Sequence, residues 1–180
     1  MKRKLIVITV FFLTAHTSDA EVAMSGWTPE SIATRVGYSA VRVDRGFAKV
    51  EALASWRLPF YQEFAGTWSS QWSLEASAGV LTRSERLGLV TSLGPWVRIG
   101  RSGWPVYGTA GIKGTLLGRN RYDEVNFGES FQFTSHIGIG LEAGRHWSVE
   151  YRLEHMSNAN IAESNPGLNL HTITVSFKFN

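Results

Sequence analysis

The 180-residue sequence contains no cysteine, so disulfide bonds do not hold the folded chain together. After the first fifteen residues, no apolar run is long enough for a transmembrane helix. The net charge of +3 is small and the basic residues are scattered, which argues against binding to nucleic acid. Helix caps followed by apolar residues at a spacing of three to four are also hard to find. If the protein lies in a membrane, it must therefore cross it with strands.

The N-terminal segment has the order of a secretory signal peptide. Residues 2–4 are basic, residues 5–15 are apolar, and the small Ala20 comes just before the first acidic residue of the following segment. The apolar stretch is short for a membrane helix, although an uncleaved anchor is the alternative. We predict a signal peptide over residues 1–20 and a single domain over residues 21–180.

Apolar and polar side chains alternate along most of the remaining chain, as in strands that have one apolar face. In "WSVEYRLEHMS" (147–157), aromatic and aliphatic residues occupy the first odd-numbered positions and charged residues occupy even-numbered ones. The same alternation occurs, with varying regularity, in segments 32–41, 48–58, 71–80, 87–100, 106–117, 131–143 and 171–179. These segments make about eight strands, the smallest number usual for a membrane β-barrel.

Two architectures have such strands: a soluble lipocalin-like or sandwich domain with apolar residues inside, and a membrane barrel with apolar residues outside. The polar face combines Glu and Arg with small residues, which suits the crowded interior of a narrow barrel where charges pair. Several tryptophans lie near strand ends, as interfacial aromatic girdles require: Trp68, Trp72, Trp96, Trp104 and Trp147. We therefore predict an all-β fold, an eight-stranded antiparallel outer-membrane β-barrel.

The lengths of the connections predict which end of the barrel faces outward. "EAGRHW" and "GRSGWP" are short, as periplasmic turns are, whereas "GRNRYDEVNFGES" and "SNANIAESNPG" are long, as extracellular loops are. The strand over 147–157 then runs outward and ends near the extracellular rim. Nearer the N-terminus, "RVDRGFAKVE" (42–51) is interpreted as an exposed connection.

Polar residues end this strand on its apolar face. His155 and Ser157 occupy odd-numbered positions, so both side chains should point to the lipid. On the following strand, Asn169 and His171 share the outward face and should lie beside His155. Polar side chains that face lipid cost free energy. We therefore expect these residues either to lie at the depth of the lipid headgroups or to act on a lipid substrate. The residues alone leave open whether Ser157 and His155 are a nucleophile and its base or ordinary loop residues.

The stretch "HMSNANI" followed by "NPGLN" resembles the PagL family of lipid A 3-O-deacylases, in its His-x-Ser-Asn-Ala motif, its Asn-x-Gly turn and its C-terminal strand. In detail the resemblance covers about the last quarter of the chain. It implies an outer-membrane esterase that hydrolyses the 3-O-linked acyl chain of lipid A. Ser157 would be the nucleophile, His155 its general base and Asn158 an oxyanion-stabilising residue. The resemblance implies neither a metal nor another cofactor.

One position departs from the family pattern. The family's triad has a Glu twelve residues after the Ser, and this chain has Asn169 there. An Asn oxygen can orient a His without supplying a full charge, and Glu163 in the intervening loop is the alternative third member.

The implied partners are lipid A or lipopolysaccharide as substrate and the surrounding membrane lipids, with no nucleic acid. The choice between a monomer and a homodimer stays open. A non-catalytic small outer-membrane barrel, with a structural, adhesion or lipid-binding role, is the alternative function.

Overall fold

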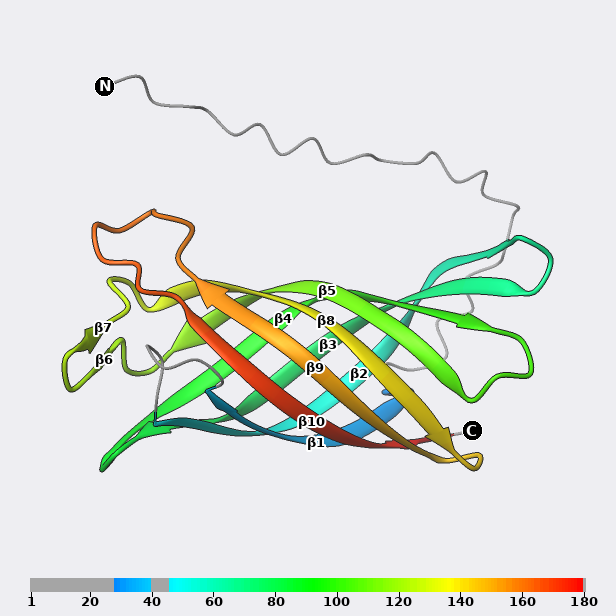
Figure 1. Cartoon of the computed structure of the whole chain (residues 1–180), viewed down its shortest axis with the longest axis horizontal. Coiled ribbons are helices and arrows are strands. Elements are labelled where there is room, and N and C mark those ends of the chain that lie inside the picture. The colour runs from blue at the N-terminus through cyan, green and yellow to red at the C-terminus, as the bar shows by residue number, and fades with distance from the viewer. Residues whose placement is uncertain (1–27, 40–45, 180) are drawn as a thin grey trace, which may run out of the picture.

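A computed structural model describes residues 28–39 and 46–179, and the predicted signal peptide lies outside these residues. Eight strands form a closed antiparallel barrel in the order β1-β10-β9-β8-β5-β4-β3-β2 (Figure 1). Their bounds are β1 Ser31–Ser39, β2 Phe47–Phe64, β3 Trp68–Arg83, β4 Arg86–Arg101, β5 Val106–Leu117, β8 Phe131–Ala143, β9 Trp147–Ser157 and β10 Leu168–Lys178. Strands β6 (Arg121–Tyr122) and β7 (Val125–Asn126) form a small hairpin within the β5–β8 connection. The described part of the chain contains no helix able to cross a membrane.

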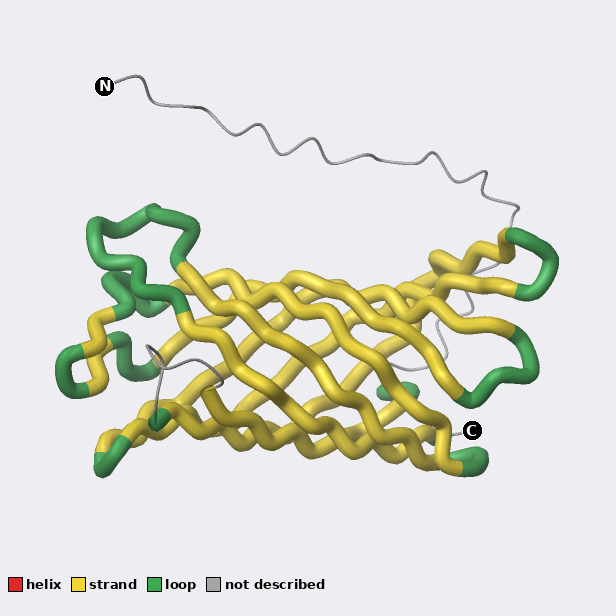
Figure 2. Tube along the Cα trace, viewed as in Figure 1, coloured by secondary structure: helices red, strands yellow, loops and turns green. Residues whose placement is uncertain are grey.

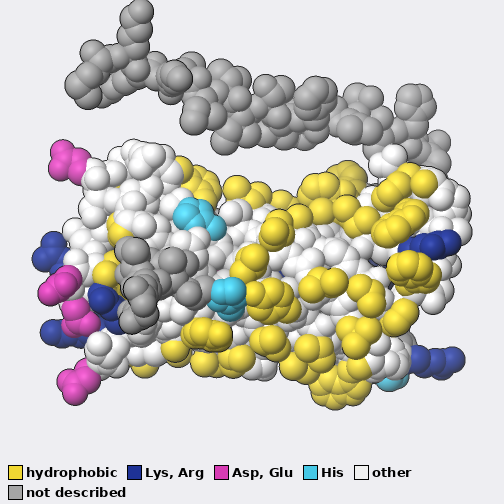
Figure 3. Space-filling view, viewed as in Figure 1, with side chains coloured by type: hydrophobic (Ala, Val, Ile, Leu, Met, Phe, Trp, Pro, Cys, Tyr) yellow, Lys and Arg dark blue, Asp and Glu magenta, His cyan; other side chains and the backbone are white. Residues whose placement is uncertain are grey.

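The barrel carries apolar side chains on its outside, and its interior holds charged and polar side chains beside one buried apolar cluster around Phe47 and Phe127, which confirms the membrane-barrel interpretation. Large hydrophobic side chains are exposed on its outer surface, for example Leu89 at 65% and Ile137 at 63%. They cover much of the face seen in Figure 3. Because successive side chains of a strand point to opposite faces, the alternation read from the sequence becomes a lipid face and a luminal face. The predicted strands are confirmed, with ends that differ by a few residues.

Paired charges fill the lumen. Four cations and four carboxylates are buried there: Arg35, Lys49, Lys113, Arg152, Glu51, Glu75, Glu150 and Glu154. Arg35 donates to both oxygens of Glu75 at 3.0–3.1 Å and lies 3.2 Å from Glu154. Lys113 and Arg152 also reach Glu75, each at 3.0 Å. Since buried charges are tolerated only when they are paired and hydrogen-bonded, this network lets a narrow barrel fill its interior with polar residues.

The connections fall at the two ends of the barrel as predicted. The long β5–β8 connection (118–130) and the β9–β10 loop (158–167) lie at one end, at the left of Figure 2. The short turns β4–β5 (102–105) and β8–β9 (144–146) lie at the opposite end, near the end of β10. Ser157 is therefore at the end that carries the long loops.

Two predictions about the barrel need correction. Trp96 does not belong to an outer girdle, because the even-numbered residues of β4 face the lumen. There the Trp96 ring lies 5.3 Å from the Arg152 guanidinium carbon. Segment 42–51 is not wholly an exposed connection, because its last five residues belong to β2 and Phe47 is 2% exposed. Residues 42–45 lie outside the described part.

Candidate active site

His155 and Asn169 lie opposite each other on the outer surface of β9 and β10. The antiparallel register pairs the two residues, and both side chains are exposed. The His155 Nδ1 and Asn169 Oδ1 atoms are 2.8 Å apart. An amide oxygen only accepts hydrogen bonds, so Nδ1 carries the proton and donates it to Asn169. This tautomer leaves Nε2 of His155 with a lone pair, which is the form that a general base needs.

Gly167 lies against one edge of the His155 imidazole. A Cβ added at Gly167 would lie 3.2 Å from Cε1 and 4.0 Å from Nε2 of His155, so the ring edge lies above this glycine. Gly167 precedes Leu168, which pairs with Met156, and thus lies at the level of Ser157. The backbone φ of 70° at Gly167 is also one that other residues rarely adopt. The Cε1–Nε2 edge of the His155 ring is therefore at the level of Ser157, which is half-buried.

Neither nearby carboxylate replaces Asn169 as the partner of the ring. Glu154 points into the lumen, 3% exposed, where Lys49 donates to it at 2.5 Å. Glu163 is exposed in the β9–β10 loop, and the acceptor for the Nδ1–H of His155 is Asn169 Oδ1. Glu154 lies inside because it occupies an even-numbered position of β9; whether Asn169 or Glu163 supports His155 in a reaction stays a prediction.

The Asn158 side chain does not face the position of an oxyanion beside Ser157. Asn158 is fully buried, and its Nδ2 donates to the carbonyls of Phe127 (2.9 Å) and Ser164 (2.8 Å). Its backbone N–H donates to Asn165 Oδ1 at 3.1 Å. The reason is again parity, since Asn158 follows the outward Ser157 and so turns inward. In this conformation Asn158 holds the backbone that follows Ser157 and has no donor left for an oxyanion.

Side chains tie the β9–β10 loop to the β5–β8 connection. Besides the Asn158 bond to Phe127, the Ser164 hydroxyl donates to the Asn126 carbonyl at 2.6 Å. The two segments pack so closely at Gly128 that an added Cβ would lie 2.3 Å from the Ser164 carbonyl oxygen. The connection beyond β5 thus supports the segment that follows Ser157, a long-range contact that no local motif reveals.

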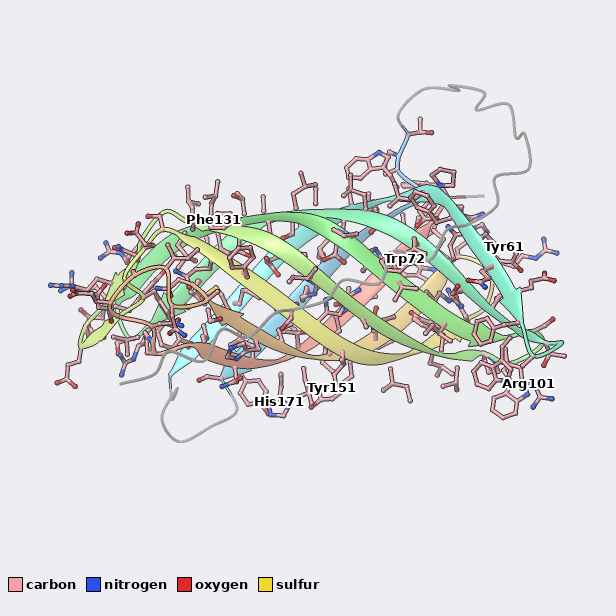
Figure 4. All side chains as sticks on the ribbon, turned by 90° about the horizontal axis from the view of Figure 1, so that it is seen from above. Tyr61, Trp72, Arg101, Phe131, Tyr151 and His171 are labelled. Carbon is pink, nitrogen blue, oxygen red and sulfur yellow. The ribbon has the colours of Figure 1, made fainter. Side chains whose placement is uncertain are left out.

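Further polar residues surround the pair; His171 was predicted to lie here, whereas Ser135, Tyr151 and Tyr38 were not. Ser135 is exposed on β8 and pairs with His155 on the side opposite Asn169. On the other side, the His171 ring stacks on Tyr38 with ring centroids 5.9 Å apart, and its Nδ1 shares a hydrogen bond with the Tyr151 hydroxyl. In Figure 4, His171 and Tyr151 lie together and point away from the barrel wall. Tyr38 is unpredictable from local sequence because barrel closure brings β1 beside β10.

An open groove on the outer surface runs beside His155 and Asn169. Its volume is about 420 Å³, and its outward-facing lining comes from β8, β9 and β10: Ser135, Ile137, Leu153, His155, Asn169 and His171. Aliphatic residues thus lie directly beside the imidazole of His155, on the surface that the apolar exterior marks as lipid-facing. Within the described residues, no group of three or more His, Asp or Glu is arranged to hold a metal ion.

Three comparisons relate this barrel to known proteins. Residues 50–178 match the family model described as lipid A 3-O-deacylase (PagL). The lipid A deacylase PagL of Bordetella bronchiseptica is 36% identical over 73 residues, which span 41% of each chain. A crystal structure of the outer membrane enzyme PagL superposes with a TM-score of 0.74 at 20% identity, covering 83% of this chain and 99% of the other. At that identity, the superposition establishes a shared fold.

Proposed function

Because the chain belongs to the PagL family of lipid A 3-O-deacylases and forms an outer-membrane barrel, we propose that it hydrolyses the 3-O-linked acyl ester of lipid A. The observation that supports this best is the His155–Asn169 hydrogen bond on the lipid-facing surface, beside Ser157. A base held in the correct tautomer on that surface has little structural use, whereas an ester in the adjacent leaflet would be within its reach.

In the proposed orientation, the long loops face the cell exterior and the short turns face the periplasm. Ser157 and His155 then lie toward the outer leaflet, where the acyl esters of lipid A are found. The reaction needs no passage of substrate through the barrel, because both side chains are on its outer surface.

The proposed mechanism has two steps. In the first, His155 Nε2 takes the proton of the Ser157 hydroxyl while Oγ attacks the ester carbonyl, and the same proton then passes to the departing 3-oxygen of the sugar. In the second, Nε2 takes a proton from water, the resulting hydroxide attacks the acyl-serine, and the proton returns to Ser157 Oγ. The products are a free fatty acid and a lipid A with one acyl chain fewer.

Asn169 and Asn158 have positioning roles in this mechanism. Asn169 fixes the tautomer and orientation of His155, as Asn does in Cys-His-Asn enzymes, but it supplies only a dipole to the imidazolium. Asn158 fixes the turn after Ser157 through its buried side chain, so any oxyanion donors would be other groups of that turn.

Mass spectrometry of lipid A from bacteria that express the protein tests the proposal. Wild-type protein should remove one hydroxyacyl chain, and Ser157→Ala or His155→Ala should reduce the deacylated fraction by about a thousandfold or more. Ser135→Ala is the matched control, because this serine also lies beside His155 on the same face but on the side away from Gly167. It should retain activity. Unmodified lipid A in cells with folded wild-type protein would contradict the proposal and favour a non-catalytic barrel.

A further inference from the structure

The apolar surface of the barrel is shorter on β9 and β10 than on β4. The outward apolar residues of β4 extend from Leu87 to Ile99, whereas those of β9 extend only from Trp147 to Leu153. At about 3.3 Å per residue and a tilt near 40°, these lengths correspond to roughly 30 Å and roughly 15 Å of membrane thickness. A membrane barrel usually has an apolar band of about 25 Å, so β4 spans it and β9 does not.

The shortfall lies at the long-loop end of these strands. At the opposite end, the Trp147 and Phe177 rings pack edge to face with centroids 5.1 Å apart, as in an ordinary aromatic girdle. Around Leu153 and above it, β9, β10 and β1 present polar groups outward instead, beginning with the hydroxyl of Tyr151. We call this surface the polar notch and define it by His155, Asn169, His171, Tyr151 and Tyr38.

The polar notch is a built feature rather than a few scattered side chains. His155 bonds Asn169, His171 bonds Tyr151, and Tyr38 stacks on His171, so each member has a partner within the group. Yet Tyr38 is 64% exposed, and the bond to Tyr151 uses only one of the two ring nitrogens of His171. Lipid tails offer no hydrogen bonds, so such groups require water or headgroups around them.

We propose that the polar notch draws the headgroup layer of the outer leaflet, together with its water, inward along this wall of the barrel. A wall whose apolar span is too short is accommodated by local thinning of the bilayer. This inference rests on the proposed function and orientation. It explains how two reactants of opposite character meet at Ser157: the acyl chain lies along Leu153 and Ile137, while water enters over the polar notch for the second step.

The inference can be tested by replacing polar residues of the polar notch with leucine and comparing deacylation in liposomes with deacylation in detergent micelles. The double variant Tyr38→Leu/His171→Leu extends the apolar surface without changing His155, Ser157 or Asn169. In liposomes that contain lipid A, deacylation should fall on the order of tenfold. In detergent micelles, which adapt their thickness to the protein, it should stay within about twofold of wild type. Thr91→Leu, which removes an outward polar group of β4, should have no effect in either environment.

An equal loss in both environments would mean that His171 or Tyr38 acts on the reaction itself, and no loss in liposomes would mean that the leaflet is undisturbed. Either result overturns the inference. A wild-type protein inactive in both environments would contradict the proposed function instead, so a second measurement must not depend on activity.

Spin labels provide that measurement. Because the sequence contains no cysteine, a single label can be attached in the variant Leu153→Cys or Leu93→Cys, each combined with Ser157→Ala. Both residues are exposed on the lipid face, each six residues from the lower edge of its apolar band, Trp147 or Ile99. For each label, we compare the spin relaxation caused by a water-soluble nickel complex with that caused by oxygen. In liposomes, this nickel-to-oxygen ratio should be several-fold higher for the label at 153 than for the label at 93. Equal relaxation at the two positions would overturn the inference, whether or not the protein deacylates lipid A.

Discussion

Glu154 and His155 are adjacent in the chain and lie on opposite faces of one strand, and their surroundings differ in kind. Glu154 is in the lumen, where Lys49 and Arg35 compensate its charge and water is nearly excluded. His155 is on the outer surface, where its partner is the neutral Asn169. The luminal face carries full charges that pair with one another, whereas the outer face carries an imidazole that is bonded to an uncharged amide. The ion-pair network and the proposed active site thus lie on opposite faces of the same sheet.

Of the variants that test this comparison, one that disrupts the luminal ion pairs should have the largest effect. Arg35→Met leaves Glu75, Glu51 and Glu154 with one cation fewer, and removing one partner of a buried ion pair typically costs about 3–5 kcal/mol. Urea unfolding followed by tryptophan fluorescence should show that loss. Arg35→Lys, which keeps the charge, should lose less. If Arg35→Met is as stable as wild type, the network does not hold the barrel together.

The link between the loops should have the next largest effect. Asn158→Ala removes the bonds to Phe127 and Ser164 and should lower the deacylation rate by about a hundredfold, or about 2–3 kcal/mol of transition-state stabilisation. KM should change little, because Asn158 is buried and positions Ser157 without touching the lipid. Asn165→Ala, which removes the loop bonds to the Asn158 N–H and to the Asn160 side chain but leaves those to Phe127 and Ser164, is the milder control. A change in KM alone would show that the loop binds substrate instead.

Substitutions of Asn169 test the His155–Asn169 hydrogen bond on the outer face of the sheet. Asn169→Ala removes the acceptor of His155 Nδ1 and should slow deacylation by about tenfold to a hundredfold, while Asn169→Glu should retain the rate or raise it by up to about tenfold. Both rates can be measured on lipid A in micelles. Wild-type activity in Asn169→Ala would remove Asn169 from the proposed mechanism.

Glu163→Ala should have the smallest effect, within about twofold of wild type, because this carboxylate is exposed in the loop and Asn169 already accepts from His155. The same micelle assay applies. Loss of activity in this variant, with Asn169→Ala active, would make Glu163 the third member of the triad.

The alternation of side chains allowed much of this molecule to be predicted. A period of two along 147–157 indicated both the strand and the outward direction of His155 and Ser157, because the direction depends only on parity. Tyr38 could not be placed beside His171 in this way, since their contact arises only when β1 closes against β10. Trp96 was misjudged for a related reason: residue type suggested a girdle, but parity turns its side chain inward. Parity also turns the Asn158 side chain inward, so the oxyanion role that the family resemblance implies for this position stays a prediction.

The ion pairs that fill the lumen also determine how molecules can travel to and from this protein. With Arg35, Lys113 and Arg152 all paired to Glu75 across its interior, the barrel formed by the described residues offers a lipid no route from one side of the membrane to the other. Any lipid that reaches His155 must arrive sideways, by diffusion within the leaflet, and the released fatty acid must leave in the same plane. The rate of encounter would then depend on how fluid and how crowded the outer leaflet is, and a cell could regulate such a protein by changing its neighbours.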